Sequence, residues 1–161
     1  MSFPKFKEFL DNHRIKYVST YHSPAYTAAQ IAALTHTPGK ELAKTVIVKV
    51  DGRLVMAVVS ASQQVDLALL KAAAGAKHAE IATEADFREK FPDCEVGAMP
   101  PFGNLYGMAV FADETLARDK EIAFNAGSHR ELMHITWEDY AGLVHPTIAE
   151  LSPKKRARPA A

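Results

Sequence analysis

The chain has 161 residues, of which 48% are hydrophobic and 9% aromatic, and this composition supports one domain with a buried core. The 19 Lys and Arg residues balance the 19 Asp and Glu residues, which excludes a strongly basic nucleic-acid wrapper and a strongly acidic disordered chain. A single cysteine, Cys94, excludes an internal disulfide framework.

Hydrophobic spacing and turn signals divide the chain into short helices and strands, without an internal repeat. Helices are predicted where apolar residues recur at helical spacing, over 3–13, 28–34, 67–73, 84–91 and 137–144. Strands are predicted where β-branched and apolar residues cluster between turns, over 17–21, 42–50, 53–60, 78–82, 107–111, 121–125 and 131–135. Hairpin-connected strands interrupted by short helices favour an α+β fold with a mixed sheet or small barrel.

The strongest local signal is the hairpin 42–60, because Asp51-Gly52 is a type I′ turn sequence between two apolar runs. A two-residue turn pairs Lys44 with Val59 and places Lys44 on the same face as Val46. A lysine at the end of an apolar face either snorkels to solvent or is held at the mouth of a pocket. The residues alone favour snorkelling.

Residues 97–103, Gly-Ala-Met-Pro-Pro-Phe-Gly, form a second candidate segment. Two prolines fix φ and remove N–H donors, so the segment suits a rigid wall better than a phosphate cradle. We expect the amides of Gly97 and Ala98 to be free to bond a small ligand. The alternative is a structural turn before a strand.

Residues 125–129, Asn-Ala-Gly-Ser-His, follow a predicted strand and could bring Ser128 and His129 to the rim of a pocket. Histidine suits proton transfer or polar positioning near neutral pH. The alternative is a solvated loop histidine. His129 and His134 would face opposite sides of a strand, and neither His-Glu-x-x-His nor Cys-x-x-Cys occurs, so we expect no metal and no cofactor.

Together, four segments resemble the YbaK/prolyl-tRNA-synthetase-associated editing-domain family of free-standing aminoacyl-tRNA deacylases. They are residues 23–30, 41–49, 91–103 and 124–129, in an order that spans about residues 20–150. The resemblance implies a mixed, mostly antiparallel β-barrel or closed sheet ringed by short helices. It places the lysine of the family on Lys44, its Gly-x-x-x-Pro loop on Gly97 and Pro101, and a polar group near the substrate on His129.

The same resemblance implies hydrolysis of the ester that joins a wrongly attached small amino acid to the terminal ribose of tRNA. The deacylase would act in trans and without a metal, with an aminoacyl-tRNA acceptor end and possibly a synthetase as partners. Lys44, Gly97, Ala98 and His129 would be the catalytic group. The expected substrate-binding residues are Val46, Val59, Met99, Pro101 and Ser128.

A competing hypothesis is a module that binds a tRNA end, a nucleotide or a synthetase without catalysis. The joint presence of Lys44, Gly97, Pro101 and His129 favours the enzyme.

We expect one domain over residues 1–151 and a basic, disordered tail over 152–161. The tail carries four positive charges and leaves 15 bases against 19 acids in the body, so an RNA contact should be confined to a small footprint. No signal peptide and no apolar run of membrane-spanning length is present, which predicts a cytoplasmic protein without a membrane partner.

Overall fold

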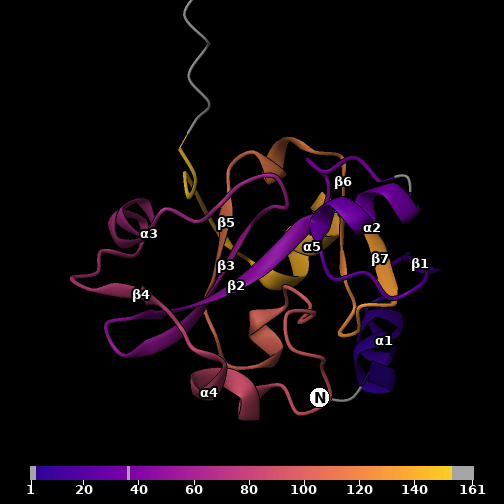
Figure 1. Ribbon diagram of the computed structural model, residues 1–161, viewed down its shortest axis with the longest axis horizontal. Helices are drawn as coiled ribbons and strands as arrows, with labels where there is room; N and C mark the ends of the chain where they lie inside the picture. Colours follow the sequence, from indigo (N-terminus) through magenta and orange to yellow (C-terminus); the bar gives the residue numbers. More distant parts are fainter. Residues whose placement is uncertain (1–2, 36, 154–161) are drawn as a thin grey trace, which may run out of the picture.

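The computed structural model describes residues 3–35 and 37–153, whose strands form two sheets (Figure 1). The three-stranded sheet has the order β1 (Val18–Tyr21), β7 (Glu131–Thr136) and β6 (Glu121–Asn125). The five-stranded sheet has the order β4 (Ala79–Ile81), β2 (Ala43–Val50), β3 (Arg53–Ser60), β5 (Val110–Asp113) and β8 (Thr147–Ala149).

Short helices surround the sheets. The α-helices are α1 (Phe3–Asn12), α2 (Ala28–Thr35), α3 (Leu67–Ala74), α4 (Glu84–Phe87) and α5 (Trp137–Val144). Three 3-10 turns are η1 (Arg88–Lys90), η2 (Gly103–Leu105) and η3 (Leu116–Arg118).

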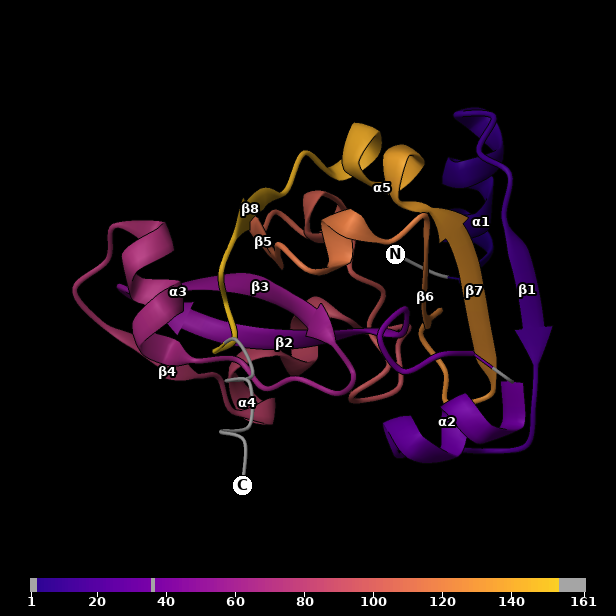
Figure 2. The same ribbon diagram turned by 90° about the horizontal axis from the view of Figure 1, so that it is seen from above.

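The prediction of a mixed, mostly antiparallel α+β fold is confirmed. The pairs β1–β7, β6–β7, β2–β3 and β2–β4 are antiparallel, whereas β3–β5 and β5–β8 are parallel. The prediction of a closed barrel is wrong, because β4 and β8 are edges with a partner on one side only. A parallel bridge between Leu42 and Ala123 links the sheets, and Figure 2 shows β6 at the edge of its sheet that faces β2.

The hairpin that the sequence predicts is present with the predicted register. Asp51 and Gly52 have φ values of 47° and 82°, as a type I′ turn requires, and Lys44 pairs with Val59. Residues 55–60 of β3 are buried, so both faces of this strand are covered.

Local capping interactions begin and end several helices. Asp66 accepts hydrogen bonds from the amides of Ala68 and Leu69 at the start of α3, and Gly75 ends this helix in the left-handed conformation. Thr83 caps α4 and Thr136 caps α5.

Three elements differ from the prediction. The helix expected over 84–91 is split into α4 and η1, and β5 begins at Val110 rather than at residue 107. Gly107 has a φ of 69° and the Met108 amide donates to the Gly103 carbonyl, so a turn occupies the expected start of that strand. The short strand β8 was not predicted, because its three residues are too few for a detectable alternation.

Most buried aromatic side chains meet in one cluster that includes residues of both sheets. Phe102 makes edge contacts with Phe6, Phe124 and Tyr140 at centroid distances of 5.0, 5.5 and 5.4 Å. On the other face of the five-stranded sheet, Leu70 of α3 and Leu151 belong to a second cluster with strand valines.

The last described residues pack against the body. Ser152, the first residue of the expected tail, is buried, and its amide donates to Asp113. The basic residues 154–158 lie outside the described residues. Within the described ranges, no helix is both long and apolar enough to cross a membrane.

Candidate functional site

Lys44 lies near the beginning of β2, paired with Val59. Its side chain is half-buried, and desolvation lowers the pKa of its ammonium group below the ordinary lysine value. Among residues 3–35 and 37–153, no carboxylate forms an ion pair or hydrogen bond with this group. The ammonium is therefore partly desolvated and has no counter-charge within the described part of the chain, which suits a site for a negatively charged or strongly polar ligand group.

Gly97 and His129, which the sequence analysis places in separate segments, meet in the fold. Gly97 has a φ of 84°, and a Cβ added to it would lie 3.6 Å from Cε1 of His129. Nε2 of His129 lies 2.8 Å from the carbonyl oxygen of Val96. Because a carbonyl oxygen only accepts, Nε2 carries the proton, and in the neutral ring Nδ1 is left as an acceptor.

Glu95 joins the same two loops and was not predicted as a site residue. Its carboxylate accepts a hydrogen bond from the His129 amide at 3.0 Å, and its own amide donates to the Gly127 carbonyl at 2.8 Å. The loop after η1 and the loop after β6 are thus fastened by side-chain and backbone contacts. No local pattern in the sequence signals this pairing, because the two segments are more than 30 residues apart.

Two buried polar atoms at the end of β6 have no hydrogen-bond partner within the described part of the chain. They are Nδ1 of His129 and Oδ1 of Asn125. Buried polar atoms are nearly always satisfied, so each of these two atoms has capacity to bind a water molecule or a ligand group. Asn125 was within a predicted segment but was not singled out.

The parallel bridge between Leu42 and Ala123 relates Lys44 to this segment. Lys44 and Asn125 each lie two residues beyond the bridge, and both chains run in the same direction there. Lys44 and Asn125 therefore both lie close to the bridge, from which β2 and β6 run in different directions (Figure 2). Among the described residues, no hydrogen bond joins Lys44 to Gly97 or His129.

Several predicted ligand contacts are occupied within the protein. The Ala98 amide donates to the Glu95 carbonyl at 3.0 Å and Ala98 is fully buried, so the prediction of a free amide is wrong for this residue. The Gly97 amide has no partner among residues 3–35 and 37–153. Ser128 Oγ accepts from the Arg130 amide, and the Pro101 carbonyl accepts from the hydroxyl of buried Tyr140 at 2.7 Å.

The expected apolar wall of Met99, Val46 and Val59 is not formed. Val46 and Val59 share the face of Lys44 and belong to the cluster with Leu70, whereas Met99 packs in the aromatic cluster on the opposite face. Side chains alternate between the two faces of the sheet along β2 and β3, which places Val46 and Val59 together on one face. Met99 lies in a loop, where no such alternation predicts the direction of a side chain.

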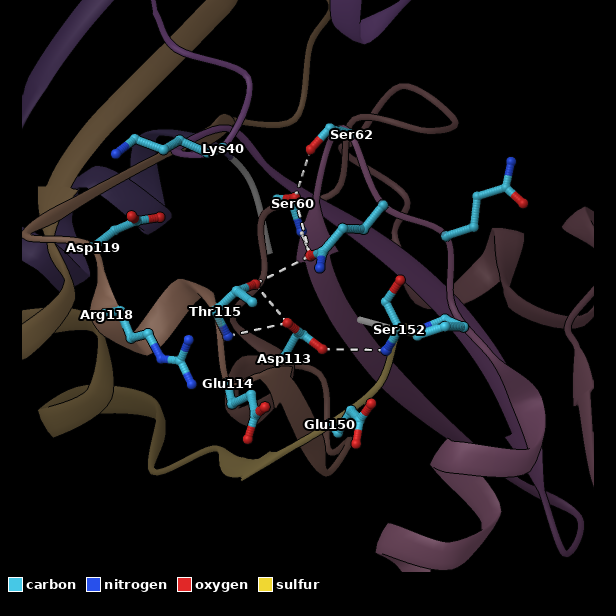
Figure 3. Close-up of a pocket in the computed structure, with 13 residues that line it drawn as sticks. Lys40, Ser60, Ser62, Asp113, Glu114, Thr115, Arg118, Asp119, Glu150 and Ser152 are labelled. Atoms are coloured by element: carbon cyan, nitrogen blue, oxygen red, sulfur yellow. Dashed lines mark hydrogen bonds between the residues drawn. The ribbon is translucent and has the colours of Figure 1, made fainter. Parts of the chain in front are cut away.

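A cavity of about 520 Å³ lined mainly by polar and charged residues lies at the end of β3, and none of the predicted site residues lines it. Figure 3 shows the side chains around it. Its side chains bond mainly to one another: Gln63 Oε1 lies 3.0 Å from Ser60 Oγ and 3.2 Å from Thr115 Oγ1, and Thr115 donates to Asp113. Asp113 also accepts from the amides of Leu151 and Ser152. This network fastens the C-terminal segment to the sheet.

Comparison with known proteins identifies the kind of domain that carries this arrangement. Residues 22–143 match the aminoacyl-tRNA editing domain family. Over 111 residues the chain is 34% identical to the multifunctional Ser/Thr-tRNA deacylase ProXp-y of Escherichia coli K12, and the match covers 66% of each chain. The match therefore spans just under two thirds of the length of that relative.

Two solved structures share the fold. One is a candidate trans-editing enzyme for prolyl tRNA synthetase, with a TM-score of 0.81, 20% identity and coverage of 94% of this chain and 96% of that one. The other is the hypothetical protein APE2540, with a TM-score of 0.83, 21% identity and coverage of 92% and 99%. The chain belongs to the aminoacyl-tRNA editing domain family, which confirms the resemblance based on its four segments.

A matched pair of glycine substitutions separates loop geometry from stability. Gly97→Ala and Gly52→Ala each force a methyl group onto a residue with φ above 80°, which costs about 1–2 kcal/mol of folding free energy. We expect urea denaturation to show a similar loss in both variants. Only Gly97→Ala should also lower the rate of the reaction catalysed at this site, because the Gly97 loop contacts His129. Equal reaction rates in the two variants would show that Gly97 does not belong to the site.

Proposed function

We propose that this protein is a trans-editing deacylase that hydrolyses the ester bond between a small amino acid and the terminal ribose of tRNA. The observation that carries the proposal is the family match over residues 22–143, a range that contains Lys44, Gly97, Pro101 and His129. The curated relative is a Ser/Thr-tRNA deacylase, so serine and threonine are the first candidate amino acids.

The proposed reaction requires little from the protein beyond placement and charge stabilisation, because an aminoacyl ester is already activated. A water oxygen bonds to the ester carbonyl carbon, the bond from that carbon to the ribose oxygen breaks, and the water proton ends on the ribose oxygen. Negative charge develops on the carbonyl oxygen in between. A preorganised donor aimed at that oxygen lowers the barrier.

Lys44 is the donor that we assign to the developing oxyanion. Burial disfavours its charge and no carboxylate among the described residues neutralises it, so the ammonium gains more from an anionic transition state than a paired surface lysine would. The Gly97 amide, which has no hydrogen-bond partner within residues 3–35 and 37–153, is a candidate second donor. Ala98 is no longer proposed for this role.

We assign His129 as a positioning residue. Its ring donates to the Val96 carbonyl and its amide bonds Glu95, so it holds the Gly97 loop in place. Asn125, with its orphan carbonyl oxygen, is a candidate acceptor for a hydroxyl or ammonium group of the substrate. The proposal also includes the acceptor end of aminoacyl-tRNA and an aminoacyl-tRNA synthetase as partners, and action in the cytoplasm.

A panel of charged tRNAs tests the proposal. tRNAs carrying alanine, serine, threonine, cysteine or proline are incubated with the protein, and release of the labelled amino acid is followed against spontaneous hydrolysis. We expect release of serine or threonine, and weaker release of amino acids that differ by one methyl group, because small apolar differences are worth only about 1–3 kcal/mol. Binding of the tRNAs without release of any amino acid would favour the non-catalytic module.

A further inference from the structure

Tyr26 is an aromatic side chain that is exposed yet held in place. Its relative exposure is 70%, and its ring lies against the ring of His129 with centroids 4.8 Å apart and an interplanar angle of 47°. The other tyrosines near the loops differ: Tyr140 is fully buried and Tyr106 is half-buried against Phe91. Tyr26 therefore contributes little to the core.

The backbone around Tyr26 is fastened on both sides. The Ala25 amide donates to the His129 carbonyl at 3.1 Å, and the Tyr26 amide donates to Oε1 of Gln30 at 3.1 Å. Gln30 also caps the start of α2 by exchanging hydrogen bonds with Thr27. These hydrogen bonds fix the backbone that carries the ring, and the contact with His129 holds the ring itself, which lowers the entropy lost when a ligand stacks on it.

The neighbourhood of Tyr26 lies at the proposed site. His129 contacts Gly97, and Val96, whose carbonyl bonds His129, has an exposed side chain. An aromatic ring that is exposed, fixed and next to a site for an RNA end matches the way in which proteins hold unpaired nucleobases, by stacking on aromatic faces.

We propose, on the basis of the deacylase function above, that Tyr26 is a positioning residue that stacks on the terminal nucleobase of the tRNA acceptor end. The stacked base lies over the Tyr26–His129 pair and carries the attached ester toward the Gly97 loop. The tRNA body contributes few contacts in this arrangement, consistent with the small footprint that the charge balance predicts.

A substitution series with an exposure-matched control tests this role in catalysis. Tyr26→Ala should raise KM for charged tRNA roughly five- to 150-fold with little change in kcat, whereas Tyr26→Phe should retain the wild-type KM. Tyr21→Ala removes a tyrosine of similar exposure, 68%, from β1 and should leave KM unchanged. Removal of the terminal base from charged tRNA should lower its affinity for the wild type but not for Tyr26→Ala. The base and the ring contribute through the same contact, so the free-energy effects of removing them are not additive.

A binding measurement keeps the inference separate from the deacylase proposal. An uncharged acceptor-stem RNA with 2-aminopurine at its terminal position reports stacking through fluorescence quenching and needs no catalysis. We expect quenching by the wild type and Tyr26→Phe and its loss in Tyr26→Ala. Equal quenching by all three proteins, or an equal loss in Tyr21→Ala, overturns the role of Tyr26 whether or not amino acids are released from charged tRNA.

Discussion

Replacing Lys44 with methionine is expected to lower kcat/KM for deacylation about 100- to 1000-fold, the range for loss of one oxyanion donor. Methionine keeps the unbranched stem that packs beside Val59 and removes only the charge. The matched control is Lys49→Met on the same strand, because Lys49 forms an ion pair with Asp86 at 3.1 Å and is outside the proposed site. Lys49→Met should retain wild-type kcat/KM.

Stability measurements on the same variants separate loss of function from loss of fold. Burial lowers the pKa of Lys44, so the unfolded chain binds more protons at this residue than the folded one, and its charge opposes folding below that pKa. Lys44→Met should therefore have a Tm at neutral pH equal to or above that of the wild type. A lowered Tm together with the lost activity would point to a structural role for Lys44.

The direction of the pKa shift also gives a pH profile. If protonated Lys44 stabilises the oxyanion, the enzyme-dependent rate should fall as pH rises through a pKa below the ordinary lysine value. Lys44→Arg should abolish this fall within the accessible pH range, because a guanidinium remains protonated. The rates are measured from mildly acidic to alkaline pH after subtraction of spontaneous hydrolysis, and a fall that persists in Lys44→Arg contradicts the assignment.

Replacing Asp113 with alanine is expected to reduce the free energy of unfolding by about 2–5 kcal/mol, because it leaves several polar groups unsatisfied. Its buried carboxylate accepts from the amides of Leu151, Ser152 and Thr115 at 2.8, 3.2 and 3.0 Å, and also from the Thr115 hydroxyl (Figure 3). Leu151 and Ser152 are themselves buried, so water does not readily replace the lost acceptor.

The control for Asp113 comes from the same cavity. Glu150 also lines it but is only partly buried, and Glu150→Ala should change the unfolding free energy by about 0.5 kcal/mol or less. Urea denaturation of both variants provides the measurement. Below its unfolding transition, Asp113→Ala should retain deacylation, because this cavity contains none of the proposed site residues; equal stability of the two variants would show that the network does not fasten the C-terminal segment.

The parts of the fold that follow from local sequence were predictable. Asp51-Gly52 admits the positive φ values of a type I′ turn, and this turn alone determines that Lys44 pairs with Val59. Asp66, Thr83 and Thr136 cap helices because their side chains reach backbone amides two or three residues away.

The parts of the fold that depend on contacts between distant segments could not be predicted from the sequence. Whether the strands close into a barrel depends on which edges pair, and β5 pairs in parallel with β3 and β8 across long stretches of chain. Glu95 and His129 come together only through loop packing, and the use of the Ala98 amide within its own turn depends on loop geometry. The hairpin register and the Gly/Pro segment made Lys44 and Gly97 candidates and the family resemblance gave them roles, whereas the parts played by Tyr26, Glu95 and Asn125 depend on the three-dimensional structure.

The most direct test of the proposed function is the release of serine and threonine from mischarged tRNA by the wild type and Lys44→Met at equal protein concentration. We expect release by the wild type well above spontaneous hydrolysis, and a rate about 100- to 1000-fold lower for a Lys44→Met protein of undiminished Tm. Release at the same rate by both proteins would contradict the assignment of Lys44, and release of no amino acid by excess wild type would contradict the deacylase itself.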